Sequence, residues 1–185
     1  MLFRSLIDMM VAISIFAILA AAAIPQLKDV SDSMKLGQGQ RDVNIELNQA
    51  RLLAVSANRP IRIRFNCPVA GQYRIVELIG STSTPDANDT ASDRCSDTKW
   101  KYPANDADPA TRPNHDGAVR DLPNGIAFGA APTLEFWPNG TVHKQAASEN
   151  PWAVVDVNGT AVTVVKGTTV KRVTVNGLGK IQLVQ

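Results

Sequence analysis

One acidic residue, Asp8, stands at the head of a long apolar run. The nineteen residues from Met9 to Leu27 carry no charge. As a helix they would rise about 28 Å, close to the ~30 Å thickness of a bilayer's hydrocarbon core. A carboxylate at the edge of a membrane is costly unless it is paired, so Asp8 predicts a functional role. The alternative is an acid that simply reaches back to the cytoplasmic interface.

The apolar run is longer than the roughly 7–15 residues of a signal-peptide core. Its four alanines, Ala20–Ala23, would suit a cleaved signal peptide, but the acid at its head and the helical pattern beyond it argue against removal. We therefore expect a membrane-spanning helix that is retained. Because Arg4 lies on the short side of the run, the N-terminus is expected in the cytoplasm and the rest of the chain in a bacterial periplasm.

The chain has two cysteines, Cys67 and Cys95, which are too far apart in sequence for a C-x-x-C metal or redox motif. In an oxidising compartment a disulfide between them is favoured. Closing that loop would stabilise the fold by roughly 3–4 kcal/mol. The alternative is a pair of buried, unpaired thiols.

The other residues that could bind a metal or act in catalysis do not have the spacing of a known metal-binding or catalytic motif. Five aspartates between residues 81 and 123 could offer oxygen ligands to Ca²⁺, but they lack the order of an EF-hand loop, so a solvated surface loop is favoured. These are Asp86, Asp89, Asp93, Asp106 and Asp108. His115 and His143 have no metal-ligand spacing. No catalytic or nucleotide-binding motif is present, so we expect neither an enzyme nor a cofactor.

Basic residues recur on the predicted strands and could form a face for DNA or a protein partner. The candidates are Arg62, Arg64, Lys171, Arg172 and Lys180. The alternative is that they form an ordinary solvated face. The formal net charge of +2 indicates no strong preference for acidic partners.

The elements that would position these residues are one long helix followed by antiparallel strands, which makes the fold class α+β. We expect a membrane and assembly helix over 1–27, kinked at Pro25, an amphipathic continuation over 28–58, and a β-rich domain over 59–185. The continuation has one apolar stripe, formed by Val43, Leu47, Ala50, Ala54 and Ala57, and it leaves Arg41, Glu46 and Arg51 for other faces.

Alternation over residues 61–67 predicts a strand with Ile61, Ile63, Phe65 and Cys67 on its buried face. Further strands are expected over 73–79, 126–128, 133–137, 152–157, 161–165, 170–175 and 180–184. Asn158-Gly159 is typical of a hairpin turn. Residues 81–123 hold five prolines and eight aspartates and are expected to form a long loop.

The stretch "SLIDMMVAISIFAILAAAAIP" resembles the N-terminus of type IV pilins and of type II secretion pseudopilins. Ser5, Leu6 and Ile7 match that pattern, Asp8 stands where the family has a glutamate, and Pro25 matches the proline that kinks the helix. "LNQARLLAVSANRPIRIRF", "LEFWPNGTV" and "KRVTVNGLGKIQL" resemble the GspH/FimT group of minor pseudopilins and minor pilins. The resemblance implies a pilin-like fold and a non-enzymatic subunit of a type II secretion pseudopilus.

The resemblance also implies partners. In this family the acid aligned with Asp8 pairs with the N-terminal amine of a neighbouring subunit, so other pseudopilins or pilins and the inner membrane are expected partners. The family's cleavage junction aligns with Phe3-Arg4, where a bulky residue replaces the usual glycine. This sequence is therefore expected to be a poor substrate for prepilin peptidase unless the true start lies upstream.

An alternative function is a FimT-like minor type IV pilin that binds DNA for natural transformation. Some proteins of that group bind DNA through a basic C-terminal motif. Here Gly179-Lys180 resembles its first part, but Gln182 occupies the second basic position, which favours the secretion role.

Overall fold

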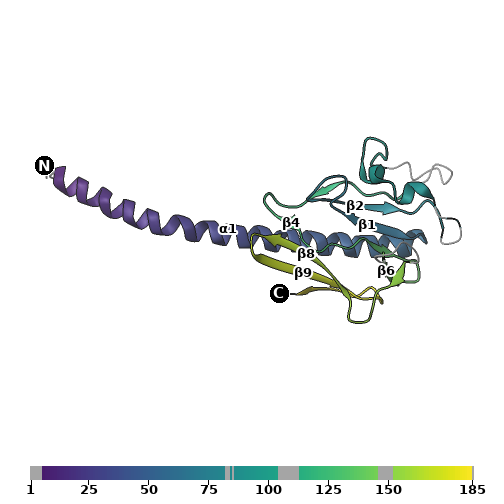
Figure 1. The fold of residues 1–185 in the computed structure, drawn as a ribbon. Helices are drawn as coiled ribbons and strands as arrows, with labels where there is room; N and C mark the ends of the chain where they lie inside the picture. The colour runs from purple at the N-terminus through teal and green to yellow at the C-terminus, as the bar shows by residue number, and fades with distance from the viewer. Residues whose placement is uncertain (1–5, 82–83, 85, 104–112, 146–151, 185) are drawn as a thin grey trace. The chain divides into compact units, whose positions relative to one another are not determined.

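The computed structural model describes residues 6–81, 84, 86–103, 113–145 and 152–184 (Figure 1). Helix α1 runs over Leu6–Ala57. By their internal contacts the residues divide into two units, Met1–Lys35 and Leu36–Gln185. The second unit contains the end of α1 and all the strands, and it is described first.

In the second unit, the apolar stripe of α1 lies in the core, as the sequence predicts. Val43, Leu47, Ala50 and Ala54 are fully buried, whereas Ala57 at the helix end is half-buried. The expectation that Glu46 faces away from the core is wrong. Its side chain is buried and its carboxylate lies 3.6 Å from the guanidinium of Arg120, because residues near the end of the long loop cover this side of the helix.

Asn58 ends α1, as the sequence predicts. Its backbone takes a left-handed conformation with φ of 53°, and the amide of the next residue, Arg59, donates to the carbonyl of Ala54. Asparagine tolerates this conformation better than most residues, and the bond satisfies a carbonyl in the last turn of the helix. The chain is thereby turned toward the first strand.

Six strands form the first antiparallel sheet, in the order β3-β2-β1-β5-β6-β7. They span Ile61–Phe65 (β1), Gln72–Glu77 (β2), Arg120–Asp121 (β3), Leu134–Phe136 (β5), Val142–Lys144 (β6) and Ala153–Val154 (β7). In the β1–β2 register Ile63 lies opposite Ile75, and both side chains are fully buried. Strands β3 and β6 were not predicted from the sequence, because Arg120-Asp121 and Val142-His143-Lys144 are too polar to show the apolar pattern of a strand.

The second sheet has four antiparallel strands, in the order β10-β9-β8-β4. These are Ala127–Phe128 (β4), Thr160–Lys166 (β8), Thr169–Val175 (β9) and Ile181–Val184 (β10). Figure 1 shows β8 and β9 below the second part of α1 and β1 and β2 above it. The Gln40 amide of α1 donates to the carbonyls of Arg172 and Val184, which joins the helix to the middle of β9 and the end of β10.

Asn158-Gly159 forms a turn, but not the predicted hairpin. The strand before it, β7, pairs with β6 in the first sheet, whereas β8 after it pairs with β9 and β4 in the second. The turn therefore passes the chain from one sheet to the other. The hairpin of the second sheet is instead β8–β9, closed by two residues, Gly167 and Thr168.

The segment expected to be a long loop contains regular structure. Two short 3₁₀-helices, η1 over Ala87–Asp89 and η2 over Ser92–Cys95, lie in it, and β3 forms near its end. Asp86 accepts a hydrogen bond from the backbone amide of Asn88 at the start of η1. Such turns are short and depend on contacts with other segments, so the apolar pattern of the sequence does not reveal them.

Candidate functional site

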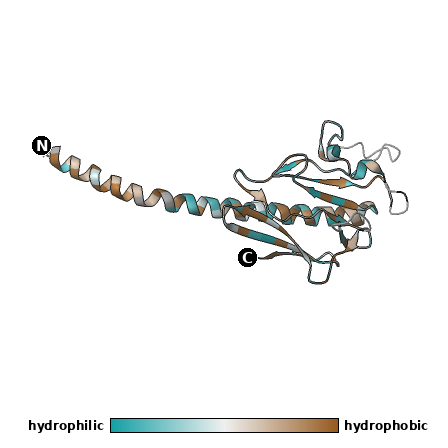
Figure 2. Ribbon diagram, in the orientation of Figure 1, coloured by the Kyte–Doolittle hydropathy of each residue, from teal (hydrophilic) through white to brown (hydrophobic). Residues whose placement is uncertain are grey.

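The first unit presents an apolar helical surface that no described residue covers. The apolar side chains described between Ile7 and Met34 are exposed, and Ile13, Phe16 and Leu19 are each more than 60% accessible. Figure 2 shows brown, apolar residues along this part of the helix. By length and composition, α1 is the one helix among the described residues that could cross a membrane. Exposure of this extent in water would be unfavourable, since burying one such side chain is worth about 1.5–3 kcal/mol.

Asp8 lies in the first turn of α1 and is exposed. Among the described residues it has no hydrogen-bond or ion-pair partner. A carboxylate in the first turn of a helix is favoured by the helix dipole, but that interaction falls short of the cost of placing it next to hydrocarbon. The position thus leaves Asp8 available to a cation from outside the described chain.

Other predicted features of this unit are only partly described. Phe3 and Arg4, the predicted peptidase junction, lie outside the described residues. α1 continues as helix through position 25, and the kink at Pro25 remains a prediction. Ser14, a polar residue within the apolar run, donates its hydroxyl proton to the carbonyl of Met10, 2.8 Å away. That bond satisfies the hydroxyl without water, as a membrane interior requires.

In the second unit, Cys67 and Cys95 form the predicted disulfide. Their Cα atoms are 5.5 Å apart, and both residues are buried. The alternative of two unpaired thiols is therefore wrong. The bond fixes the end of η2 to the residues that follow β1, so that the segment after β2 folds back across the first sheet.

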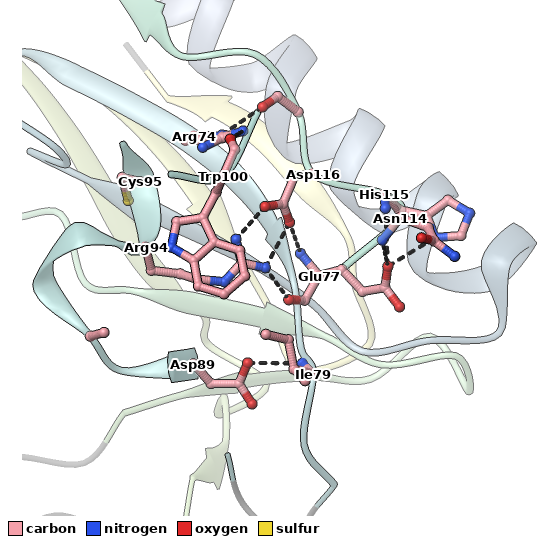
Figure 3. Close-up of polar contacts among 12 residues, drawn as sticks. Arg74, Glu77, Ile79, Asp89, Arg94, Cys95, Trp100, Asn114, His115 and Asp116 are labelled. Carbon is pink, nitrogen blue, oxygen red and sulfur yellow. Dashed lines mark hydrogen bonds and ion pairs between the residues drawn. The ribbon is translucent and has the colours of Figure 1, made fainter. Parts of the chain in front are cut away.

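A buried ion pair next to the disulfide holds this segment (Figure 3). Arg94 is fully buried, forms two hydrogen bonds with the carboxylate of Asp116, and donates to the carbonyl of Glu77 at 2.8 Å. Its guanidinium also lies 4.4 Å from the ring centroid of Trp100. A buried charge with a carboxylate partner, a carbonyl and an aromatic face is compensated, so this group orders the segment without being left unpaired.

Glu77 is a second buried centre of polar contacts. One carboxylate oxygen accepts from the backbone amides of Asn114 and His115 and lies 3.1 Å from the His115 ring, and the other accepts from Arg59. Burial alone would raise the pKa of Glu77. The hydrogen bonds outweigh burial and hold the pKa below its usual value.

Two arginines of the predicted basic face are used inside the protein. Arg62 is buried, donates to the carbonyl of Asp89 at 2.6 Å, and stacks 4.2 Å above the ring of Trp152. Arg64 is half-buried and donates to the carbonyl of Ala91. Both interpretations of Arg62, a contact for DNA and a solvated side chain, are therefore wrong, because η1 and its flanking residues cover this face of β1.

The other basic candidates lie elsewhere. Arg172 is exposed on β9, Lys180 is exposed before β10, and Lys171 is half-buried. Lys171 lies close to α1, with its Nζ 3.3 Å from the position that a Cβ on Gly37 would occupy. Because β1 belongs to one sheet and β9 to the other, the five predicted residues do not form a single basic face.

The aspartates considered for Ca²⁺ have separate structural roles. Asp86 caps η1, Asp89 accepts from the amides of Ile79 and Gly80, and Asp93 pairs with Lys99. Asp106 and Asp108 lie outside the described residues. Within the described part of the chain, no three acidic, histidine or cysteine side chains are grouped for a metal.

Sequence reasoning missed the residues that organise the second unit. Arg94, Asp116 and Glu77 are far apart in the chain and meet only because the disulfide segment folds over β2. Arg74, fully buried, supports the same segment by donating to the carbonyls of Gly117 and Trp100. The only hint in the sequence is that Arg94 adjoins Cys95.

Comparisons with known proteins found similar solved structures but no matching sequence family. No family model and no curated protein matches the chain. Two crystal structures of the type IV minor pilin FimU from Pseudomonas aeruginosa strain PAO1 are similar to it. One is 16% identical with a TM-score of 0.48, and the alignment covers 83% of this chain and 91% of the FimU chain. The other is 17% identical with a TM-score of 0.45, and its alignment covers 81% of this chain and 93% of the FimU chain.

Proposed function

We propose that this chain is a non-enzymatic subunit of a filament of the type IV pilin kind. The observation that carries the proposal is one helix with two different surfaces. Residues 9–27 expose an uncharged apolar surface with an acid at its head, and the later residues of α1 pack in the core with strands of both antiparallel sheets. An apolar surface of this kind suits a bilayer before assembly and packing against other apolar helices afterwards.

Residues 1–27 would anchor the subunit in the inner membrane, and 59–185 would form its periplasmic domain. In assembly, the Asp8 carboxylate would pair with a cationic group of a neighbouring subunit, the N-terminal amine by resemblance to the family. Such a pair removes the cost of an isolated charge in an apolar setting, so it would favour one register between neighbouring subunits.

Substitution of Asp8 tests the assembly role. Cells would express full-length Asp8→Ala, and cross-linking in the membrane would report contacts between this subunit and others of its filament. We expect cross-linked species to fall about tenfold, equivalent to 1.4 kcal/mol, with the amount of membrane-bound monomer unchanged. Asp29→Ala is the matched control, because Asp29 is also an exposed acid of α1 but lies beyond the apolar run. Equal cross-linking in both variants would contradict the role of Asp8.

More specifically, we propose a minor pseudopilin of a type II secretion system. The burial of Arg62 supports this over a DNA-binding pilin, since it removes one cation from the predicted basic face. The test is a mobility shift of labelled DNA by the full chain in detergent at low salt. No shift is expected; a salt-sensitive shift that Arg172→Gln and Lys180→Gln abolish would favour the DNA-binding alternative.

A further inference from the structure

Four turns of the second unit contain an asparagine followed by glycine. The pairs are Asn124-Gly125, Asn139-Gly140, Asn158-Gly159 and Asn176-Gly177. In such a pair the backbone nitrogen of glycine can attack the side-chain amide carbon of asparagine, because glycine has no Cβ to obstruct the approach. Whether it does so in a folded protein depends on how the glycine N–H is held.

In three of the pairs the glycine N–H is held in place. Gly140 donates to the carbonyl of Trp137 at 2.9 Å, Gly159 donates to that of Asp156 at 2.9 Å, and Gly177 donates to the same oxygen at 3.4 Å. Two of these glycines are also closely packed. A Cβ on Gly159 would lie 3.0 Å from the carbonyl oxygen of Val175, and one on Gly177 would meet that of Val155. Attack at these sites would require local opening of the turn.

Asn124-Gly125 differs from the other three. The amide of Ile126 donates to the carbonyl of Pro123 at 2.9 Å, so the pair occupies the two central positions of a β-turn, and Gly125 has φ of +81°. Both residues are exposed. Within the described part of the chain, the N–H of Gly125 and the side chain of Asn124 make no hydrogen bond. Within the described residues, no hydrogen bond of the Gly125 N–H therefore has to break before this nitrogen reacts.

A cation lies beside this turn. Lys166, the last residue of β8, places its Nζ 2.9 Å from the position that a Cβ on Gly125 would occupy. The pairing of Ala127 in β4 with Val165 in β8 brings the two segments together. Negative charge develops on the glycine nitrogen and on the attacked carbonyl during ring closure, and a nearby ammonium stabilises it.

We propose that Asn124 is a site of self-catalysed modification, converted to aspartate and isoaspartate with Lys166 promoting the reaction. A bond forms between the Gly125 nitrogen, which loses its proton, and Cγ of Asn124. The bond from Cγ to Nδ2 breaks, and Nδ2 takes up a proton and leaves as ammonia. Water then opens the cyclic imide at either carbonyl, giving aspartate or isoaspartate, with no oxidant or reductant involved.

The product would alter a contact between the turn and α1. Leu122, Pro123 and Ile126 all approach Gly39 of α1, each 3.4–3.5 Å from where its Cβ would be. Isoaspartate lengthens the backbone of the turn by one methylene and places a carboxylate beside Lys166. The modification would therefore act where the turn packs against α1 in the second unit.

The first test follows all four pairs in one molecule. Full-length protein in detergent is incubated at mildly alkaline pH, digested, and analysed by mass spectrometry for amide-to-acid conversion and for isoaspartate. In the folded protein we expect Asn124 to convert at least about tenfold faster than the other three, whereas in denaturant the four rates converge within about threefold. Conversion at another pair as fast as at Asn124 in the folded protein would overturn the proposal.

The second test concerns Lys166. Lys166→Met is expected to slow conversion at Asn124 about fivefold and to leave the other three sites slow, which also shows that the variant is folded. Lys144→Met, a lysine at the end of another strand, is the matched control and should leave the Asn124 rate unchanged. An unchanged rate in Lys166→Met would show that the promoting role of Lys166 is wrong.

Discussion

At the scale of residues, the segment after β2 is held by a charge pair without access to solvent. Removing one partner leaves the other charge buried and uncompensated, which costs about 3–5 kcal/mol. Asp116→Asn should therefore lower the free energy of unfolding of the second unit by about 3 kcal/mol, measured by denaturant titration.

Asp93→Asn is the matched control for that variant. It breaks the Lys99–Asp93 pair, whose side chains are about half exposed, and should change stability by less than about 0.5 kcal/mol. An equal loss in both variants would show that burial is not what makes the Arg94–Asp116 pair important.

Glu77 makes the same segment sensitive to acid. Its folded-state pKa lies below the ordinary value of 4.5, so its contribution to stability is complete above about pH 4.5 and is lost as pH falls through the folded-state pKa. Denaturant titrations at a series of acidic pH values should show this loss in the wild type and less of it in Glu77→Gln. A pH dependence that is identical in the two proteins would contradict the assignment.

At the scale of elements, the disulfide connects η2 to the residues after β1 and spans 28 positions in sequence. Replacing both cysteines by serine should lower the free energy of unfolding by about 3 kcal/mol, because the unfolded chain gains loop entropy. Chemical reduction of the wild type should give a similar loss. A loss below about 1 kcal/mol in both would indicate that the arginine contacts hold the segment without the covalent bond.

The elements also show where sequence patterns suffice. Periodicity places Val43, Leu47, Ala50 and Ala54 in the core correctly, since the repeat of a helix is local. The same reasoning fails for Glu46, because whether a polar residue beside the stripe is covered depends on a segment more than 70 positions later, around Arg120. It also fails for Asn158-Gly159, whose turn geometry does not specify the partners of its flanking strands.

At the scale of the whole molecule, the part of α1 in the first unit and the part in the second unit suit different surroundings. Ile15 and Ile45 are both exposed isoleucines of α1, one in the apolar unit and one in the unit that holds the sheets. Lysine at the centre of a membrane helix costs about 2.5–3.5 kcal/mol. Ile15→Lys should therefore move the full chain out of the membrane fraction on cell fractionation, whereas Ile45→Lys should not. Equal recovery of both variants in membranes would contradict the anchor.

The sequence alone determined the long helix, its apolar first part with Asp8 at the head, the buried stripe and the α+β class, and it favoured the pairing of the cysteines that the structure shows. Each follows from periodicity, composition or cysteine chemistry, which are read along the chain. Only the tertiary structure decided which charges are buried, that the segment after β2 covers Arg62 and encloses Arg94 with Asp116, and how the strands divide between two sheets. These depend on contacts between residues distant in sequence, and such contacts leave no local pattern because any of several segments could have covered the same strand.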